Sequence, residues 1–297
     1  ADVVLLGSSM AANYYGSEIG QVFGGTGLRL TIPDGYFSEF DQVMGLLMRT
    51  HKPKRVIFAM DTNILTRSPD GVTGAMPGYL YDANPVNDAK YLLNKDVLYY
   101  SLYALMCQRW GQGETLDEGF SWDNTVWWNH MTALEEYQRP NIAAEKMPED
   151  GLLADTAKNL AVVTRWAETY PDVEFDLFLS PYSILYWDKI GRTGETDAVF
   201  AALKLACETL LPYENITLHG LLFDREIIEQ LDYYCDYVHH SAEAGELVLD
   251  KIRCGADLLT AENYQEILAN WRDFVVNYDY DKFWDENYWI QFHTAAS

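Results

Sequence analysis

Near its start the chain reads Val3-Val4-Leu5-Leu6-Gly7-Ser8-Ser9, a short and fully apolar run that ends in a tight turn. Such a run is typical of a strand that is buried on both faces of a parallel sheet. The serines that follow would then lie at the carboxyl end of that strand, where open parallel sheets bind their ligands. The chain opens without methionine and enters this run almost at once, which leaves a removed targeting or anchor segment open.

Short apolar runs and helical stretches alternate along most of the chain. Further strands are predicted at Leu28 to Ile32, Arg55 to Met60, Phe175 to Leu179 and Ile216 to Leu218. Helices are predicted at Phe37 to Arg49, Leu152 to Tyr170, Asp197 to Leu210, Ala242 to Cys254 and Ala261 to Val276. Such alternation favours one α/β domain over residues 1–297, with a mainly parallel sheet between two helical layers.

Residues from about 66 to 150 interrupt this alternation with clusters of glycine, proline, asparagine and aromatic residues, around an apolar stretch near Val97 to Trp110. We interpret them as an insertion that covers the carboxyl edge of the strands rather than as a second domain. Its aromatic side chains could line a groove that stacks sugar rings, or fill a small secondary core, which is the more common outcome. These side chains are Tyr79, Tyr81, Trp122, Trp127 and Trp128.

The charge balance limits the ligands that the chain can take. Its formal charge of −24 comes from 45 acidic against 21 basic residues, and no basic stripe is present. Nucleic acid is therefore excluded as a partner, and the same field disfavours anionic substrates and anionic membrane surfaces. Neutral or cationic ligands remain. No stretch approaches the roughly 20 apolar residues of a membrane span, and no signal peptide is present.

The four cysteines lie far apart and form no Cys-x-x-Cys pair, so neither a zinc ribbon nor a dithiol redox motif is indicated. A chain of this size needs no disulfide to fold, which favours buried free thiols over disulfides. They are Cys107, Cys207, Cys235 and Cys254.

The segment Asp236-Tyr237-Val238-His239 offers an acid and a base three residues apart. At the start of a helix this spacing would place both side chains on one face, where the carboxylate could orient the imidazole. Ser9 would become nucleophilic if that imidazole took its proton. His240 competes with His239 for the role of base, but the spacing favours His239.

The chain start resembles the first sequence block of the SGNH, or GDSL-type, hydrolases, in which Gly-Asp-Ser follows the first strand and its serine is the nucleophile. Ser9 falls on that serine, and Ser8 replaces the aspartate. Asp236-Tyr237-Val238-His239 is similar to the Asp-x-x-His block near the end of the same family. The resemblance implies a three-layer α/β/α domain of the flavodoxin-like kind, a triad of Ser9, Asp236 and His239, and no metal or cofactor.

Two further blocks of this family supply hydrogen-bond donors to the oxyanion. The best match for the glycine of the second block is Gly25, and Ala59-Met60-Asp61-Thr62 stands where the third block has Gly-x-Asn-Asp. An ionised Asp61 would repel an oxyanion, so Asn63 is the alternative donor beside the backbone N–H groups of Ser9 and Gly25. Otherwise Asp61 would cap a strand end or pair with Arg67.

The segments Gly-Ser-Ser-Met, Phe-Leu-Ser-Pro-Tyr-Ser (178–183) and Asp-Tyr-Val-His-His-Ser (236–241) resemble a subgroup of SGNH-like proteins from Gram-positive bacteria that are tied to cell-surface polysaccharides. This resemblance implies an esterase or O-acyltransferase that acts on acyl esters, acetyl above all, of a surface glycan, in an extracellular or cell-surface location. Substrate contacts are expected from Asp61, Tyr182, Trp127 and Trp128.

Two other functions remain open at this stage. The protein could be an inactive relative that binds glycan or assists its assembly, because fold alone never fixes function. A metal-dependent or phosphoryl hydrolase would need an ion held by a cluster such as Asp61, His239 and His240. The sequence gives no indication of the oligomeric state.

Overall fold

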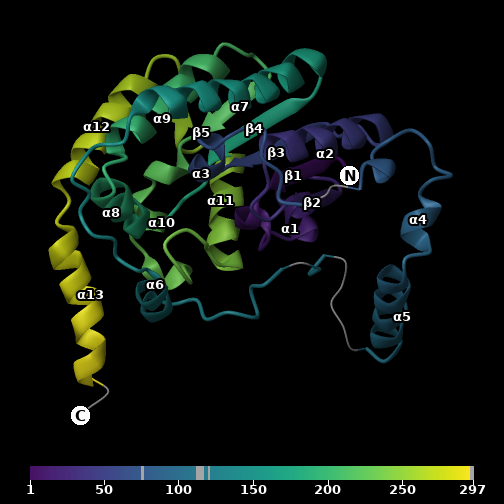
Figure 1. Ribbon diagram of the computed structural model, residues 1–297, viewed down its shortest axis with the longest axis horizontal. Coiled ribbons are helices and arrows are strands. Elements are labelled where there is room, and N and C mark those ends of the chain that lie inside the picture. Colours follow the sequence, from purple (N-terminus) through teal and green to yellow (C-terminus); the bar gives the residue numbers. More distant parts are fainter. Residues whose placement is uncertain (75–76, 112–116, 120, 295–297) are drawn as a thin grey trace.

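The computed structural model describes residues 1–74, 77–111, 117–119 and 121–294, with the side chains of 288–294 left out. Within these residues the chain forms a six-stranded sheet in the order β2-β1-β3-β4-β5-β6 (Figure 1). The strands are β1 (Val3–Gly7), β2 (Gly27–Thr31), β3 (Arg55–Met60), β4 (Glu174–Leu179), β5 (Ile216–His219) and β6 (Leu258–Leu259). The first five are parallel and β6 is antiparallel. This is the flavodoxin-like strand order, and the predicted fold class is confirmed.

Strand β1 lies inside the sheet because its sequence has no polar side that could face water. All five of its residues are buried. Leu5 lies beside Arg29 of β2 on one side and beside Ile57 of β3 on the other. The turn after Gly7 therefore emerges at the carboxyl edge of the sheet, between two neighbouring strands.

Two helical layers cover the sheet (Figure 1). Helices α2 (Phe37–Thr50), α7 (Glu149–Thr169), α9 (Thr196–Leu210) and α12 (Tyr264–Asn277) lie together on one face. On the other face α1 (Gly16–Phe23) packs against β1, β2 and α11 (Ala242–Cys254). Helices α2, α7, α9, α11 and α12 each begin and end within a few residues of a predicted helix. Helix α1 was not predicted from the sequence.

The remaining helical elements range from single turns to helices of 15 residues. They are η1 (Ser9–Ala11), α3 (Thr62–Leu65), η2 (Gly78–Leu80), α4 (Ala89–Leu92), α5 (Lys95–Arg109), α6 (His130–Glu136), α8 (Ile184–Arg192), η3 (Leu221–Phe223), α10 (Arg225–Ile228), η4 (Leu231–Tyr233) and α13 (Tyr280–Thr294).

The segment predicted as an insertion contains η2, α4, α5 and α6, and its residues 75–76, 112–116 and 120, Met76 included, lie outside the described part. Helices α4 and α5 stand apart from the sheet in Figure 1. Trp122, further along the same segment, contacts Asn13 and His239. Among the described residues, no helix is long and apolar enough to cross a membrane.

All four cysteines are free. Cys207 and Cys235 are buried, as expected of structural thiols, and burial raises the pKa of each thiol to about 12. Cys107 is partly exposed and Cys254 is exposed, so the expectation of buried thiols is wrong for these two.

Candidate active site

Ser9 begins a single turn of 3-10 helix directly after β1. The hydroxyl of Ser8 caps this turn by accepting a hydrogen bond from the Met10 amide. Ser9 Oγ lies 2.9 Å from Nε2 of His239, although the two residues are 230 positions apart in the sequence. The Ser9 side chain is partly exposed, so a ligand can reach it.

His239 and Asp236 meet through a turn that precedes α11. One oxygen of Asp236, Oδ2, lies 2.6 Å from Nδ1 of His239, and the other accepts the backbone amides of Val238 and His239, each at 2.7 Å. The prediction that a helix face brings the two side chains together is wrong, because α11 begins only at Ala242 and residues 235–238 form a bend just before His239. An aspartate accepting from the backbone two and three residues ahead holds the same geometry.

The charge of Asp236 is stabilised despite its burial. Burial acts to raise the pKa of this carboxyl, but the His239 ring and the two backbone amides outweigh it and hold the pKa below its ordinary value. Asp236 is therefore ionised at neutral pH. With Nδ1–H of His239 donated to Asp236, Nε2 is left to accept the proton of Ser9.

The neighbouring His240 is a buried structural residue. Its Nδ1 donates to the carbonyl of Ser241 at 3.0 Å, and its Nε2 lies 3.4 Å from the hydroxyl of Tyr14. Burial lowers the pKa of His240 to about 4, so the ring stays neutral. Of the two candidate bases, only His239 lies within hydrogen-bonding distance of Ser9.

Trp122, from the predicted insertion, packs against the candidate base. Its ring stands edge-on to His239 with 4.8 Å between centroids and an interplanar angle of 81°. The Trp128 ring lies 5.5 Å beyond Trp122. The sequence had marked both tryptophans as aromatic candidates but gave no sign that Trp122 would contact His239.

Two polar residues that the sequence analysis missed tie this insertion to the site. Asn13 accepts from the backbone amide of Trp122 at 3.2 Å and donates to the carbonyl of His240 at 3.1 Å. Asp123 accepts from the first amide of α11, that of Ala242, at 2.8 Å. Asn13 follows Ser9 by only four residues, so the sequence could have predicted that it lies near the site. Its hydrogen-bond partners could not be predicted, because they come from distant parts of the chain.

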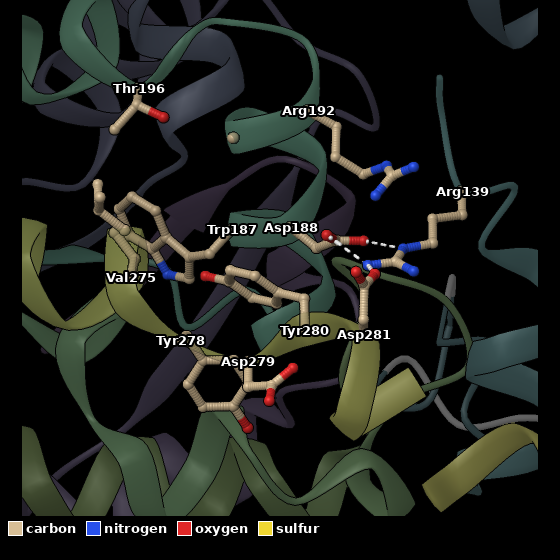
Figure 2. A pocket seen from close by; sticks show the side chains of 12 residues that line it. Arg139, Trp187, Asp188, Arg192, Thr196, Val275, Tyr278, Asp279, Tyr280 and Asp281 are labelled. Atoms are coloured by element: carbon tan, nitrogen blue, oxygen red, sulfur yellow. Dashed lines mark hydrogen bonds and ion pairs between the residues drawn. The ribbon is translucent and has the colours of Figure 1, made fainter. Parts of the chain in front are cut away.

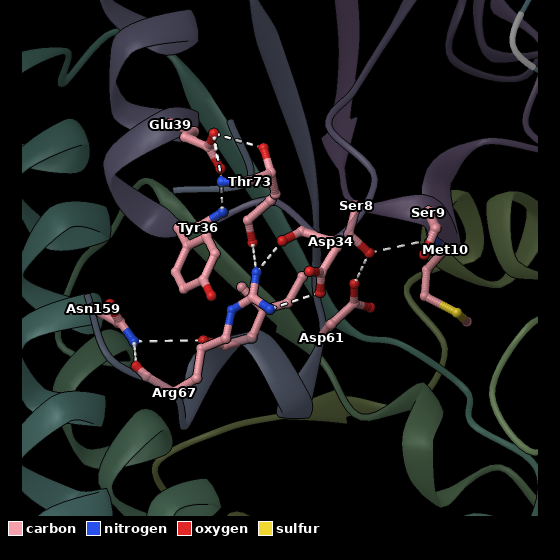
Figure 3. Close-up of polar contacts among 12 residues, drawn as sticks. Ser8, Ser9, Met10, Asp34, Tyr36, Glu39, Asp61, Arg67, Thr73 and Asn159 are labelled. Atoms are coloured by element: carbon pink, nitrogen blue, oxygen red, sulfur yellow. Dashed lines mark hydrogen bonds and ion pairs between the residues drawn. The ribbon is translucent and has the colours of Figure 1, made fainter. Parts of the chain in front are cut away.

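Asp61 lies at the carboxyl end of β3 and is only 2% exposed. Ser8 donates a hydrogen bond to its Oδ2, as Figure 3 shows. Burial raises the pKa of Asp61 to about 6, against the opposing effects of the Ser180 and Ser8 hydroxyls and of the charges on His239 and Arg67.

Neither simpler role considered for Asp61 is found. The residue precedes α3, but its side chain makes no capping hydrogen bond. The Arg67 guanidinium instead pairs with Asp34 at 2.7 Å and lies over the Tyr36 ring (Figure 3). Asp61 is thus a buried carboxylate held close to the serine turn and to His239.

The prediction that Gly25 lines an oxyanion hole is wrong. Its backbone lies against Asp2, just before β1 begins, and Gly27 pairs with Val3. In a parallel sheet this register puts Gly25 at the amino edge, the length of a strand away from Ser9. Asn63, in contrast, follows β3 at the carboxyl edge, where its side chain is exposed.

The predicted substrate residues are scattered. Tyr182 is 2% exposed and packs on the Tyr186 ring at 4.7 Å, so it does not form the wall of an open cleft. Asp61 is equally buried, while Trp127 is 79% exposed. Of the two predicted tryptophans, Trp128 is the one that lies near His239, through Trp122.

The other aromatic residues of the insertion do not join them. Tyr79 lies under the ammonium group of Lys90, and the carbonyl of Tyr81 accepts from Arg49 at the end of α2. The five aromatic side chains therefore form neither one groove nor one secondary core.

A separate hollow lies between α8 and the start of α13 (Figure 2). There Arg139 makes two hydrogen bonds to the buried Asp188, at 2.7 and 3.1 Å, and pairs with Asp281 at 2.7 Å. Two carboxylates thus neutralise this guanidinium, and none of the predicted site residues lines the hollow. Within the described part of the chain, no group of three or more His, Cys, Asp or Glu side chains is arranged to hold a metal ion.

No protein-family model and no curated protein sequence matches the chain. Three solved structures are distantly similar to it. A candidate platelet activating factor from Streptococcus pneumonia is 12% identical, with a TM-score of 0.43 over 86% of this chain and 82% of that one. A candidate acylhydrolase from Bacteroides fragilis is 10% identical, with a TM-score of 0.39 over 91% and 87%.

The third is a carbohydrate esterase described as having divergent catalytic and non-catalytic binding functions. It is 10% identical, with a TM-score of 0.41 over 90% of this chain and 66% of that one. Likenesses this distant carry no inference about the chemistry of the present chain.

Proposed function

We propose that this protein is a serine esterase or O-acyltransferase with Ser9 as nucleophile, His239 as general base and Asp236 as the residue that orients His239. The observation that carries the proposal is the continuous hydrogen-bonded chain from Ser9 Oγ to His239 Nε2 at 2.9 Å and from His239 Nδ1 to Asp236 at 2.6 Å. Serine, histidine and aspartate in this order are the arrangement that makes a serine hydroxyl nucleophilic.

The first half of the reaction follows from these contacts. Ser9 Oγ attacks the ester carbonyl while its proton passes to His239 Nε2. Asp236 stabilises the imidazolium without taking the proton itself. The negative oxygen of the tetrahedral intermediate would be held by the Ser9 backbone N–H and by Asn63.

Collapse of the intermediate breaks the ester bond, and His239 returns the proton to the departing alcohol. The second half runs the same steps with water, or with a sugar hydroxyl, as the attacking group. Water gives hydrolysis and a sugar hydroxyl gives acyl transfer.

As substrate we propose acyl esters, acetyl above all, of a glycan outside the cell or at its surface. The pair of Trp122 and Trp128 beside His239 supports this, because indole rings stack on the apolar face of a pyranose. The charge of −24 favours a neutral ligand such as an acetylated sugar over an anionic one. The extracellular location is part of this proposal and rests on the family resemblance.

The test of the proposed function is covalent capture by a fluorophosphonate probe, which bonds its phosphorus to an activated serine oxygen and loses fluoride. Intact mass should show one added probe group on the wild type and none on Ser9→Ala or His239→Ala. Ser68→Ala and His51→Ala, two exposed residues, are the matched controls and should label normally. Labelling that persists in Ser9→Ala would refute the assignment.

A folded wild type that takes no label would favour the inactive glycan-binding protein. Asp61 is the feature that supports this alternative, since a buried carboxylate at the serine turn opposes a developing oxyanion. The variant Asp61→Asn separates the two cases. If Asp61 alone suppresses turnover, the variant gains the labelling that the wild type lacks, and a glycan binder with no working triad gains none.

A further inference from the structure

Helices α4 and α5 form an arm, residues 89–110, that the rest of the described chain leaves uncovered (Figure 1). Every residue of α5 is exposed except Val97 and Cys107, which are half-buried. Eleven large apolar side chains of the arm are exposed: Tyr91, Leu92, Leu93, Leu98, Tyr99, Tyr100, Leu102, Tyr103, Leu105, Met106 and Trp110. Exposed apolar patches of this size mark an interaction surface.

The side chains of α5 are ordered around its axis. At 100° per residue, Leu98, Leu102 and Leu105 fall within one narrow stripe, and the three tyrosines extend the apolar arc to roughly 220°. Ser101 and Gln108 lie in the remaining arc of about 140°, together with the apolar side chains of Val97 and Ala104. A second helix covers only about one stripe of its partner, so a simple helix pair would leave most of this arc in water.

Charge distinguishes the arm from the body. The arm holds three basic residues, Lys90, Lys95 and Arg109, against one acidic residue, Asp96, and so carries +2 on a chain of −24. Lys95 and Arg109 are the first and last residues of α5, and no charged residue lies between Asp96 and Arg109. A helix with cationic ends, a leucine stripe and flanking Tyr and Trp rings has the composition of a helix that lies in a membrane interface.

We propose that the arm docks on a lipid bilayer, with α5 lying in the plane of the membrane and its leucine stripe immersed below the headgroups. The occupant of the surface is thus lipid, with anionic headgroups meeting Lys95 and Arg109. At 1.5 Å per residue, α5 is roughly 22 Å long. The acidic body is screened from the headgroups beyond about 8 Å at physiological ionic strength.

Vesicle flotation tests this proposal on the full chain, with vesicles of phosphatidylcholine alone and of phosphatidylcholine with phosphatidylglycerol at 7:3. We expect the wild type to float with both and to bind the anionic vesicles more tightly. The variant Leu102→Glu/Leu105→Glu changes two side chains that are 61% and 62% exposed, so the fold should be kept. Its partition coefficient should fall by about a hundredfold, because two leucines no longer enter the apolar layer.

The matched control is Leu247→Glu/Val276→Glu, which adds the same two charges at exposed apolar positions of α11 and α12 and should float like the wild type. A wild type that stays in solution, or an arm variant that floats equally well, overturns the proposal. So does a dimer in solution that the arm variant dissociates while neither protein floats, since the occupant would then be a second copy. Fluorophosphonate labelling without vesicles reports on Ser9 independently of either outcome.

Discussion

Replacing Asp61 by asparagine should stabilise the fold at neutral and alkaline pH and leave it unchanged in acid. The carboxyl has a pKa of about 6 in the folded protein against an ordinary value of 3.8, chiefly because it is buried. The folded state therefore binds its proton more tightly than the unfolded state does. The stability that this proton contributes is fully present below pH 3.8 and is lost as the pH rises through 6.

The size of the effect follows from the shift. A difference of about 2 pKa units between the folded and unfolded states corresponds to about 3 kcal/mol. Asparagine has the same shape, can still accept the hydrogen bond of Ser8 and carries no charge at any pH. Its amide can donate to the Ser180 hydroxyl, which in the wild type opposes the rise in the pKa of Asp61.

Urea unfolding of both proteins at pH 4, 6 and 8 measures this directly. The free energy of unfolding of Asp61→Asn should exceed that of the wild type by only about 0.5 kcal/mol at pH 4 and by about 3 kcal/mol at pH 8. Asp70→Asn removes one exposed carboxylate and should change stability by less than about 0.5 kcal/mol. A difference that is independent of pH, or an Asn variant that is less stable at pH 8, would refute the reasoning.

Three further changes have defined outcomes. Asp236→Asn should slow probe labelling by about 10⁴-fold, because His239 loses the acceptor that fixes its tautomer, and an unchanged rate would exclude Asp236 from the mechanism. Trp122→Ala should slow labelling about tenfold, because the His239 ring loses its edge contact, whereas the exposed Trp127→Ala should not; equal effects would show that Trp122 has no special part. Leu177→Ala, in the centre of β4, should lower the free energy of unfolding by about 2–5 kcal/mol in urea titration, and a loss below 1 kcal/mol would mean that the site refills.

The strands of the sheet could be predicted from local sequence patterns, because each buried strand is an apolar run of a few residues. Arg55–Met60 was predicted with the bounds that β3 has, and Val3–Leu6 lies within β1. Ser9, Asp236 and His239 were paired from residue type and spacing alone, and the structure brings their side chains together. The end of a buried strand can be predicted from the sequence, because an apolar run gives way there to polar residues.

The rest depended on three-dimensional register. Gly25 was assigned to the wrong edge of the sheet, because a glycine-rich sequence does not show whether it lies at the amino or the carboxyl edge. The pairing of Gly27 with Val3 places it at the amino edge. The contact of Trp122 with His239 joins an irregular insertion to a distant turn, and no periodicity encodes it. The turn that joins Asp236 to His239 is fixed by two backbone amides, which the sequence does not distinguish from a helix start.

The distance along the chain between Ser9 and its base has a consequence for the protein during its synthesis. A ribosome makes the nucleophile first and must add 230 more residues before His239 exists. At roughly 5–20 residues per second this takes roughly 10–50 s. Throughout that interval we expect the Ser9 hydroxyl to have no proton acceptor, so the nascent chain cannot attack the esters around it. A truncated product that ends before residue 236 lacks both Asp236 and His239 and should have no esterase activity.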